Sequence, residues 1–208
     1  MKTSILLAVV LLFNIGTITS QTNSAVEKAV EKVDQAQTLE DWKQCRNQFE
    51  RLAVMEADNW LPAYYMIYTD IKLSFWSENG TEKERYLEEA KNYLEKIKKM
   101  KLTDNKIRSE INTIRGYIYY ALMALNPSVN GPRYTGLVID CYSDALKLNP
   151  ENPRAILLNA YFQKSLAAFM NSNYNTFEDD LKKAYILLEK EDKHNAFPHW
   201  GKNEFPTD

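Results

Sequence analysis

Histidine and cysteine, the side chains best suited to metal binding or catalysis, are rare in this 208-residue sequence. His194 and His199 stand close together in a proline-containing segment, and no cysteine lies near them. Because zinc sites combine several His or Cys ligands at regular spacing, this pair is a weak metal signal. The sequence contains no glycine-rich phosphate loop, nucleophile elbow or metal-binding helix motif. We therefore expect a protein that is not an enzyme and that has no metal and no cofactor.

Cys45 and Cys141 each lie within an apolar pattern that has helical spacing. Export from the cytoplasm would permit a disulfide between them. A free cysteine in such a pattern, however, packs as a small hydrophobic residue. We therefore favour two buried, free cysteines and expect no disulfide.

The first twenty residues differ from the rest of the chain. Lys2 precedes an apolar run from Ile5 to Phe13, and small and polar residues follow as far as Ser20. This pattern is typical of a secretory signal peptide. The run is too short to cross a bilayer, which takes about 20 apolar residues. We expect cleavage after Ser20 and an exported mature chain, periplasmic or secreted, without an integral membrane segment.

The charge balance limits the kinds of partner. The chain has 26 Lys and Arg against 28 Asp and Glu, a formal net charge of −2, and loss of the leader would remove one further positive charge. Such a balance provides no basic surface for nucleic acid, so we expect no nucleic-acid partner. The apolar content of 45% can fill a sizeable core, and six glycines with few alternating β-branched runs predict a helical protein.

The stretch from residue 144 to residue 160 predicts where one helix ends and the next begins. Pro150 ends the first helix, because proline lacks an amide proton and its ring clashes with the preceding turn. Pro153 suits the first turn of the second helix, where that proton has no partner. A connection this short makes the two helices antiparallel neighbours.

This junction resembles the one between tetratricopeptide (TPR) repeats, helix–turn–helix units of about 34 residues. Ala145, Leu148 and Pro150 stand where that family closes its second helix, and Gly116 and Tyr119 match its first helix. A residue without a side chain lets two helices approach closely, and the aromatic ring fills the next gap. The chain also resembles uncharacterised exported TPR-like proteins of Bacteroidetes, through the segments "GPRY" at 131–134 and "PHWG" at 198–201.

These resemblances imply an all-α fold, a TPR-like α-solenoid (an α-α superhelix) of about four antiparallel helix pairs with an irregular C-terminal tail. Such a stack would place the two cysteines on helix pairs that are not neighbours, beyond bonding distance. The helix pairs are expected at about 22–57, 58–104, 105–150 and 151–190. The expected divisions are a signal peptide at 1–20, a repeat domain at 21–190 and a tail at 191–208.

In such a stack the first helices line a concave face, and the polar positions of that face contact ligands. Tyrosine beside arginine and lysine is typical of binding hot spots, because the ring buries apolar area and keeps a polar tip. Alternatively, these tyrosines pack between helices as core. The resemblance places the following residues on the concave face: Tyr65, Lys72, Glu110, Thr113, Tyr117, Tyr120, Arg154, Leu157, Tyr161 and Lys164.

Two segments depart from the repeat pattern. The stretch 124–136 contains about ten extra residues relative to a standard repeat, and we expect an ordered loop there. Arg133 and Tyr134 of this loop either cap the groove or a partner, or plug the repeat core. In the tail, Trp200 either docks on the exposed apolar side of the last repeat or belongs to a partner-binding peptide, and residues 206–208 fray.

Two functions are compatible with this pattern. The first is a non-enzymatic scaffold that binds a protein or peptide partner along the tyrosine-lined groove. The alternative is a small-molecule or glycan binding protein with a pocket beneath the insert at 124–136. Stacked aromatic rings that enclose a cavity would favour the alternative.

Overall fold

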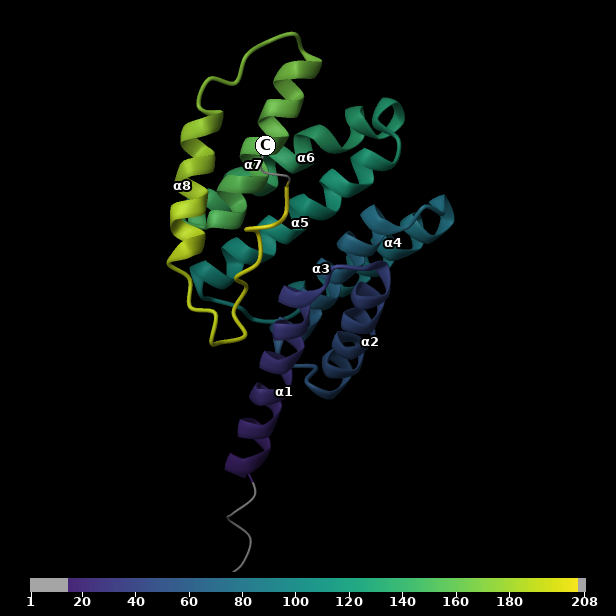
Figure 1. Ribbon diagram of the computed structural model, residues 1–208, viewed down its shortest axis with the longest axis vertical. Coiled ribbons are helices and arrows are strands. Elements are labelled where there is room, and N and C mark those ends of the chain that lie inside the picture. The colour runs from purple at the N-terminus through teal and green to yellow at the C-terminus, as the bar shows by residue number, and fades with distance from the viewer. Residues whose placement is uncertain (1–14, 206–208) are drawn as a thin grey trace, which may run out of the picture.

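The regular structure of the protein is entirely helical over the part that the computed structural model describes, residues 15–205, with side chains described from residue 25 (Figure 1). The predicted all-α fold is therefore confirmed for this range. The eight helices are α1 (Ile15–Gln35), α2 (Leu39–Met55), α3 (Trp60–Trp76), α4 (Gly80–Lys98), α5 (Asn105–Leu125), α6 (Pro127–Leu148), α7 (Pro153–Phe169) and α8 (Phe177–Glu189).

The expected signal peptide lies mostly outside the described residues, as does the expected fraying of 206–208. The backbone of residues 15–20 forms the first turns of α1, so no boundary in the helix marks the expected cleavage point. Across the described range, none of the helices combines the length and the hydrophobicity that a membrane crossing requires. The leader and its cleavage stay predictions.

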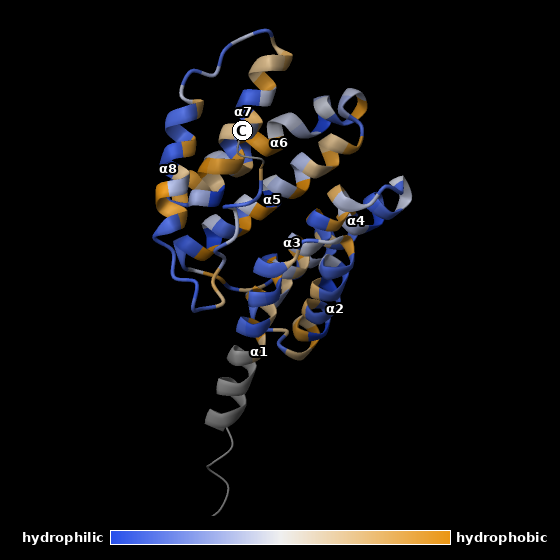
Figure 2. Cartoon of the chain, viewed as in Figure 1, coloured by the Kyte–Doolittle hydropathy of each residue, from blue (hydrophilic) through white to orange (hydrophobic). Residues whose placement is uncertain are grey.

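Successive helices pack as four hairpins, close to the expected limits of the helix pairs. The pairs α1–α2, α3–α4, α5–α6 and α7–α8 are in contact, and each second helix also contacts the first helix of the next pair. The first helices contact one another in order, α1 with α3, α3 with α5 and α5 with α7. We call α3, α5 and α7 the inner row. In Figure 2 the outer helix α2 is mainly hydrophilic, whereas α3 is buried along most of its length, as a largely apolar helix must be.

Short polar residues and prolines begin several helices, and Pro153 does so where the sequence predicts. The Asn152 side chain accepts a hydrogen bond from the Ala155 amide at 3.1 Å, and Pro153 occupies the first turn of α7. Thr38 forms a reciprocal capping box with Asp41 at the start of α2. These caps satisfy amides that have no partner inside the helix, so each helix starts at a defined residue.

The insert is helical, which corrects the expected loop at 124–136. Asn126 alone separates α5 from α6, and its side chain accepts a hydrogen bond from the Val129 amide while Pro127 opens the helix. The Asn130 side chain donates to the Leu122 carbonyl at 2.7 Å across the hairpin. Pro132 removes one backbone hydrogen bond near the helix start without ending the helix. The extra residues therefore lengthen both helices of the hairpin.

Both cysteines are buried and free, Cys45 on α2 and Cys141 on α6. Cys141 Sγ accepts a hydrogen bond from Arg115 Nε at 3.0 Å. Burial raises the pKa of the Cys45 thiol to about 11, so this thiol stays protonated at neutral pH.

Candidate functional site

The chain after α8 turns back and lies across the inner row, where Figure 1 shows it in front of α5 and α7. We call residues 191–205 the C-terminal segment. Between residues 192 and 205 there is one backbone–backbone hydrogen bond, from the Glu204 amide to the Gly201 carbonyl at 3.2 Å. Side-chain contacts with α3, α5 and α7 therefore hold this segment in place.

The carboxylate of Glu204 is bound by donors from two helices of the inner row. It accepts hydrogen bonds from the Tyr68 hydroxyl at 2.8 Å and from Lys72 Nζ at 3.1 Å, both on α3. The hydroxyl of Tyr117, on α5, donates to the same carboxylate. The Glu204 side chain is 2% exposed. Burial, together with the nearby Glu204 charge, raises the pKa of both tyrosines well above their usual value, so both hydroxyls keep their protons as donors.

The indole of Trp200 lies against the same two tyrosines. Its ring stacks on Tyr68 with centroids 4.3 Å apart and on Tyr117 with centroids 5.9 Å apart. Its Nε1 donates to the Tyr64 hydroxyl at 3.1 Å. A planar ring and a carboxylate of the C-terminal segment thus occupy one aromatic, hydrogen-bonding surface of α3 and α5.

Arg154 on α7 fixes the beginning of the C-terminal segment. Its guanidinium contacts Glu110 of α5 at 2.9 Å and Glu191 at 2.6 Å, and it donates to the Trp200 carbonyl at 3.2 Å. Burial by itself would lower the pKa of Arg154, but the two carboxylates outweigh burial and hold this pKa well above its usual value. The arginine is fully buried, and loss of one partner would leave an uncompensated charge inside the protein.

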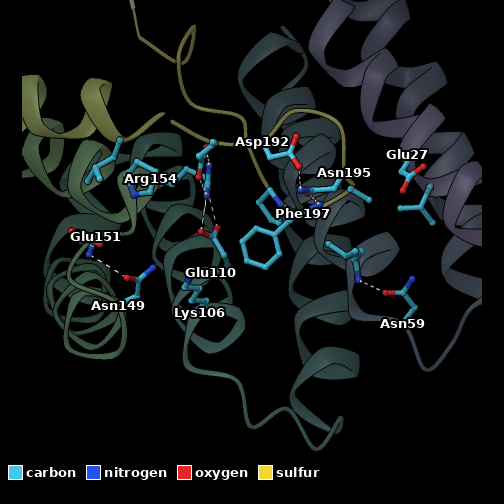
Figure 3. Close-up of a pocket in the computed structure, with 17 residues that line it drawn as sticks. Glu27, Asn59, Lys106, Glu110, Asn149, Glu151, Arg154, Asp192, Asn195 and Phe197 are labelled. Carbon is cyan, nitrogen blue, oxygen red and sulfur yellow. Dashed lines mark hydrogen bonds and ion pairs between the residues drawn. The ribbon is translucent and has the colours of Figure 1, made fainter. Parts of the chain in front are cut away.

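Two cavities lie beside the C-terminal segment. The first, of about 640 Å³, is shown in Figure 3, where Arg154 points toward Glu110 and Phe197 stands between α3 and α5. Five carboxylates and two cations line it, so its charge disfavours an anionic ligand. The carboxylates are Glu27, Glu110, Glu151, Glu191 and Asp192, and the cations are Lys106 and Arg154.

The second cavity, of about 360 Å³, combines aromatic rings with lysines. It lies between α1, α2, α3 and residues 199–204 of the C-terminal segment. The indole N–H of Trp42 is buried and has no hydrogen-bond partner within the described part of the chain. The nitrogens of His199 are occupied, with Asp34 at 2.9 Å and the Phe197 carbonyl at 3.0 Å. The aromatic residues of this cavity are Trp42, Tyr68, Trp76 and Trp200, its lysines are Lys72, Lys193 and Lys202, and its carboxylates are Asp34 and Glu204. Lys72 is paired with Glu204, and Lys202 is paired with Glu189.

The structure brings most of the expected concave-face residues to the C-terminal segment. Tyr65 donates to the Phe197 carbonyl at 3.5 Å, and the ring of Tyr161 stacks on Phe205 at 3.7 Å. Leu157 lies beside Gly201. Five of the expected residues are buried there, so their use by an external partner stays a prediction. They are Tyr65, Glu110, Tyr117, Arg154 and Leu157. The residues that contact the segment are Tyr65, Lys72, Tyr117, Arg154, Leu157 and Tyr161, with Glu110 joined through Arg154.

The other expected site residues lie elsewhere. Thr113 is buried against Ser109 and Asn152, and Tyr120 packs against Phe162. Lys164 lies over the Phe177 ring.

At the far end of α6, Arg133 is exposed, and Tyr134 stacks on Tyr119. Within residues 25–205, the contacts of these two residues do not extend to the C-terminal segment. A cavity of about 230 Å³ between α3, α4 and α5 touches the insert at Ala124 and Leu125.

The sequence analysis did not identify three residues of this site, Tyr68, Trp42 and Glu204. Tyr68 could have been found, because it lies between Tyr65 and Lys72 at helical spacing and therefore shares their face. Glu204 carries no local signal, since its partners are far away in the sequence. Trp200 is buried; its ring stacks on tyrosines of α3 and α5, and Arg154 of α7, in the last helix pair, lies over the same ring at 5.8 Å.

Comparison with known proteins identifies a structural neighbour. No family model and no curated protein matches the sequence. Among solved structures, the HusA haemophore from Porphyromonas gingivalis is similar, with a TM-score of 0.70 and 26% identity over 86% of each chain. The neighbour is a protein of Bacteroidetes, which agrees with the coarser part of the expected resemblance. Its name does not identify it as a TPR protein.

Proposed function

We propose that this protein is a non-enzymatic binding protein for a planar, largely apolar small molecule with a carboxylate group, and that haem is a ligand of this class. The second cavity carries the proposal, because the helices provide three aromatic rings, Lys72 and an indole N–H without a partner in the described part of the chain. The similarity to a haemophore supports the choice of haem.

The chemistry of the cavity suits such a ligand. Aromatic rings stack on a planar molecule and remove its apolar faces from water. Lysines pair with carboxylates, and Lys72 also lies over the Trp42 ring at 5.4 Å. Both nitrogens of His199 have partners, so the proposal assigns no iron ligand to it. Recognition would depend on the ring face and on the carboxylate.

The architecture and the location belong to the same proposal. The contacts between successive helix pairs support a TPR-like α-solenoid, in which each pair covers the apolar side of its neighbour. A haem carrier of this kind works outside the cytoplasm, and the predicted leader supports a periplasmic or secreted protein. A scaffold for proteins or peptides is the less favoured function, because the C-terminal segment covers Tyr65 and Tyr117.

Haemin titration followed by absorbance tests the proposed function. We expect the purified protein to bind haemin, and Trp76→Ala to weaken binding about tenfold through loss of one stacking ring. Trp76 is 45% exposed, so its removal should leave the fold intact.

Phe169→Ala is the matched control, since Phe169 is an aromatic residue that is 86% exposed and lies away from the cavity. Its affinity for haemin should equal that of the wild type. Equal affinities for the Trp76 variant and a wild type that binds haemin would contradict the proposed function.

A further inference from the structure

The two side chains by which the C-terminal segment contacts α3 and α5 have the chemistry of the proposed ligand. Trp200 presents a planar aromatic ring, and Glu204 presents a carboxylate four residues later. We propose that these side chains occupy, in the free protein, the binding site of an aromatic carboxylate, and that the ligand binds by displacing residues 199–205. This inference rests on the proposed function and names the site, the ligand class and the step that admits it.

The carboxylate-binding groups belong to the helices and stay in place when the segment leaves. Tyr68 and Lys72 lie one turn apart on α3, and Tyr117 faces them from α5. All three donors bind Glu204, and within residues 25–205 this is the hydrogen bond that each tyrosine hydroxyl makes. Hydrogen bonds from lysine and from phenol to a carboxylate are the strong, charge-assisted kind. A ligand carboxylate would find the same three donors.

Trp42 supplies a second and independent observation. Its ring meets Tyr68 edge-on at 5.8 Å, and it lines the second cavity beside Lys72. Its buried indole N–H has no partner in the described part of the chain, which is costly for a donor removed from water. An acceptor on a bound ligand would satisfy this donor.

The size of the second cavity indicates that the segment must move for a large ligand. Ligand sites usually measure about 300–1,000 Å³, and this cavity of about 360 Å³ is near the lower end. Residues 199–204 form one side of it. Their displacement would add the faces of Tyr68 and Tyr117 that Trp200 now covers.

The structure of the segment suits such a movement. The single backbone hydrogen bond between residues 192 and 205 means that no helix or strand has to unfold. Gly201 has a φ of 126°, a conformation that other residues rarely adopt. Two contacts hold the preceding part of the segment in place. Glu191 pairs with Arg154 of α7, and the Phe197 ring packs against Trp60 of α3. The chain can therefore swing beyond Pro198 while its start stays attached.

Glu204→Gln tests whether the segment competes with the ligand. The substitution weakens the docked segment and leaves the helix donors intact, so haemin should bind at least about tenfold more tightly than to the wild type. Glu88→Gln is the matched control, because it makes the same charge change at an exposed position of α4 and should not alter the affinity.

Lys72→Met added to Glu204→Gln tests whether the ligand carboxylate takes the place of Glu204. With the ion pair already removed, loss of the lysine should weaken haemin binding about tenfold. Haemin dimethyl ester, which has no carboxylate, should bind the single and the double variant equally. This pair of ligands separates a carboxylate contact from a general change in the cavity.

Gly201→Ala opens the segment by a different route. A residue with a Cβ is strained in this backbone conformation, so the docked state should lose about 5- to 100-fold in population. Haemin affinity should rise by up to the same factor. Far-UV circular dichroism verifies that each variant is folded.

The outcomes separate the two proposals. If the wild type binds haemin and neither Glu204→Gln nor Gly201→Ala binds it more tightly, the displacement is wrong. The carboxylate site is wrong if the added Lys72→Met weakens the binding of haemin and of its ester equally. It is also wrong if the substitution weakens the binding of neither ligand. If the wild type and all variants, including Gly201→Ala, fail to bind haemin, the proposed function itself fails, and this inference fails with it.

Discussion

At the scale of single residues, buried charges are the least ordinary feature of the protein. Asp70, in the middle of α3, is fully buried; its Oδ1 accepts a hydrogen bond from Arg46 Nε at 2.7 Å, and its Oδ2 has no partner in the described structure. Burial raises the pKa of Asp70 to about 7, although Arg46 acts in the opposite direction. An oxygen without a donor explains why the proton is retained so far above the usual range.

The raised pKa of Asp70 predicts a pH-dependent stability. Between about pH 4 and pH 7 the folded protein keeps a proton that the unfolded chain releases, so the free energy of unfolding falls as the pH rises through this window. Asp70→Asn removes this titration. We therefore expect the free energy of unfolding of Asp70→Asn to fall less than that of the wild type between about pH 5 and about pH 8, as measured by urea denaturation. Parallel profiles for the variant and the wild type would show that Asp70 is ionised throughout.

At the scale of helices, the sequence signals were strongest where they are local. Pro150 and Pro153 placed the end of α6 and the start of α7, because their effects act within one helical turn. The insert at 124–136 was misjudged, since its proline and glycines indicated a loop. The Asn126 cap and the bond from Asn130 to Leu122 outweigh those signals once α5 and α6 pack together.

Gly116 confirms the expected close approach of two helices and allows a test. A Cβ at this position would lie 2.6 Å from the ring of Tyr142. The Tyr142 side chain is fully buried between α5 and α7, so the ring has little room to move away. Gly116→Ala should therefore lower the free energy of unfolding by about 1–3 kcal/mol, in spite of the better helix propensity of alanine. Urea denaturation followed by circular dichroism measures the change.

Gly136→Ala, in α6, is the matched control for this helix contact. No atom lies within 4 Å of the added Cβ, so the variant should be unchanged or up to about 1 kcal/mol more stable. Equal effects of the two substitutions would show that the contact between Gly116 and Tyr142 is not tight.

At the scale of the whole molecule, the C-terminal segment completes the core of the inner row. Trp200 is part of the main hydrophobic cluster, and Phe205 packs against it and against the smaller cluster between α7 and α8. The helices alone would leave Tyr64, Tyr65, Tyr68 and Tyr117 without their cover. A proposed ligand of the same chemistry would restore that cover, which links stability to binding.

Shortening the chain to end at Glu191 tests this role of the segment. Removal of a buried tryptophan side chain lowers the free energy of unfolding by about 3–5 kcal/mol in other protein cores. The urea midpoint of the shortened chain should therefore fall clearly. The exposed tyrosine surface should bind the dye ANS in the absence of urea. A chain that lacks only residues 206–208 serves as the control. An unchanged midpoint without dye binding would show that the segment is peripheral.

Sequence alone determined the class of structure and the junction between α6 and α7, because prolines and apolar spacing act over a few neighbouring positions. It also indicated that tyrosines, lysines and an arginine gather on the first helices. Only the tertiary structure decided what covers them, since the hydrogen bond from Tyr68 to Glu204 joins residues 136 positions apart. Such a contact leaves no periodic trace in the chain, because it joins α3 and α5 to a segment that is distant in the sequence.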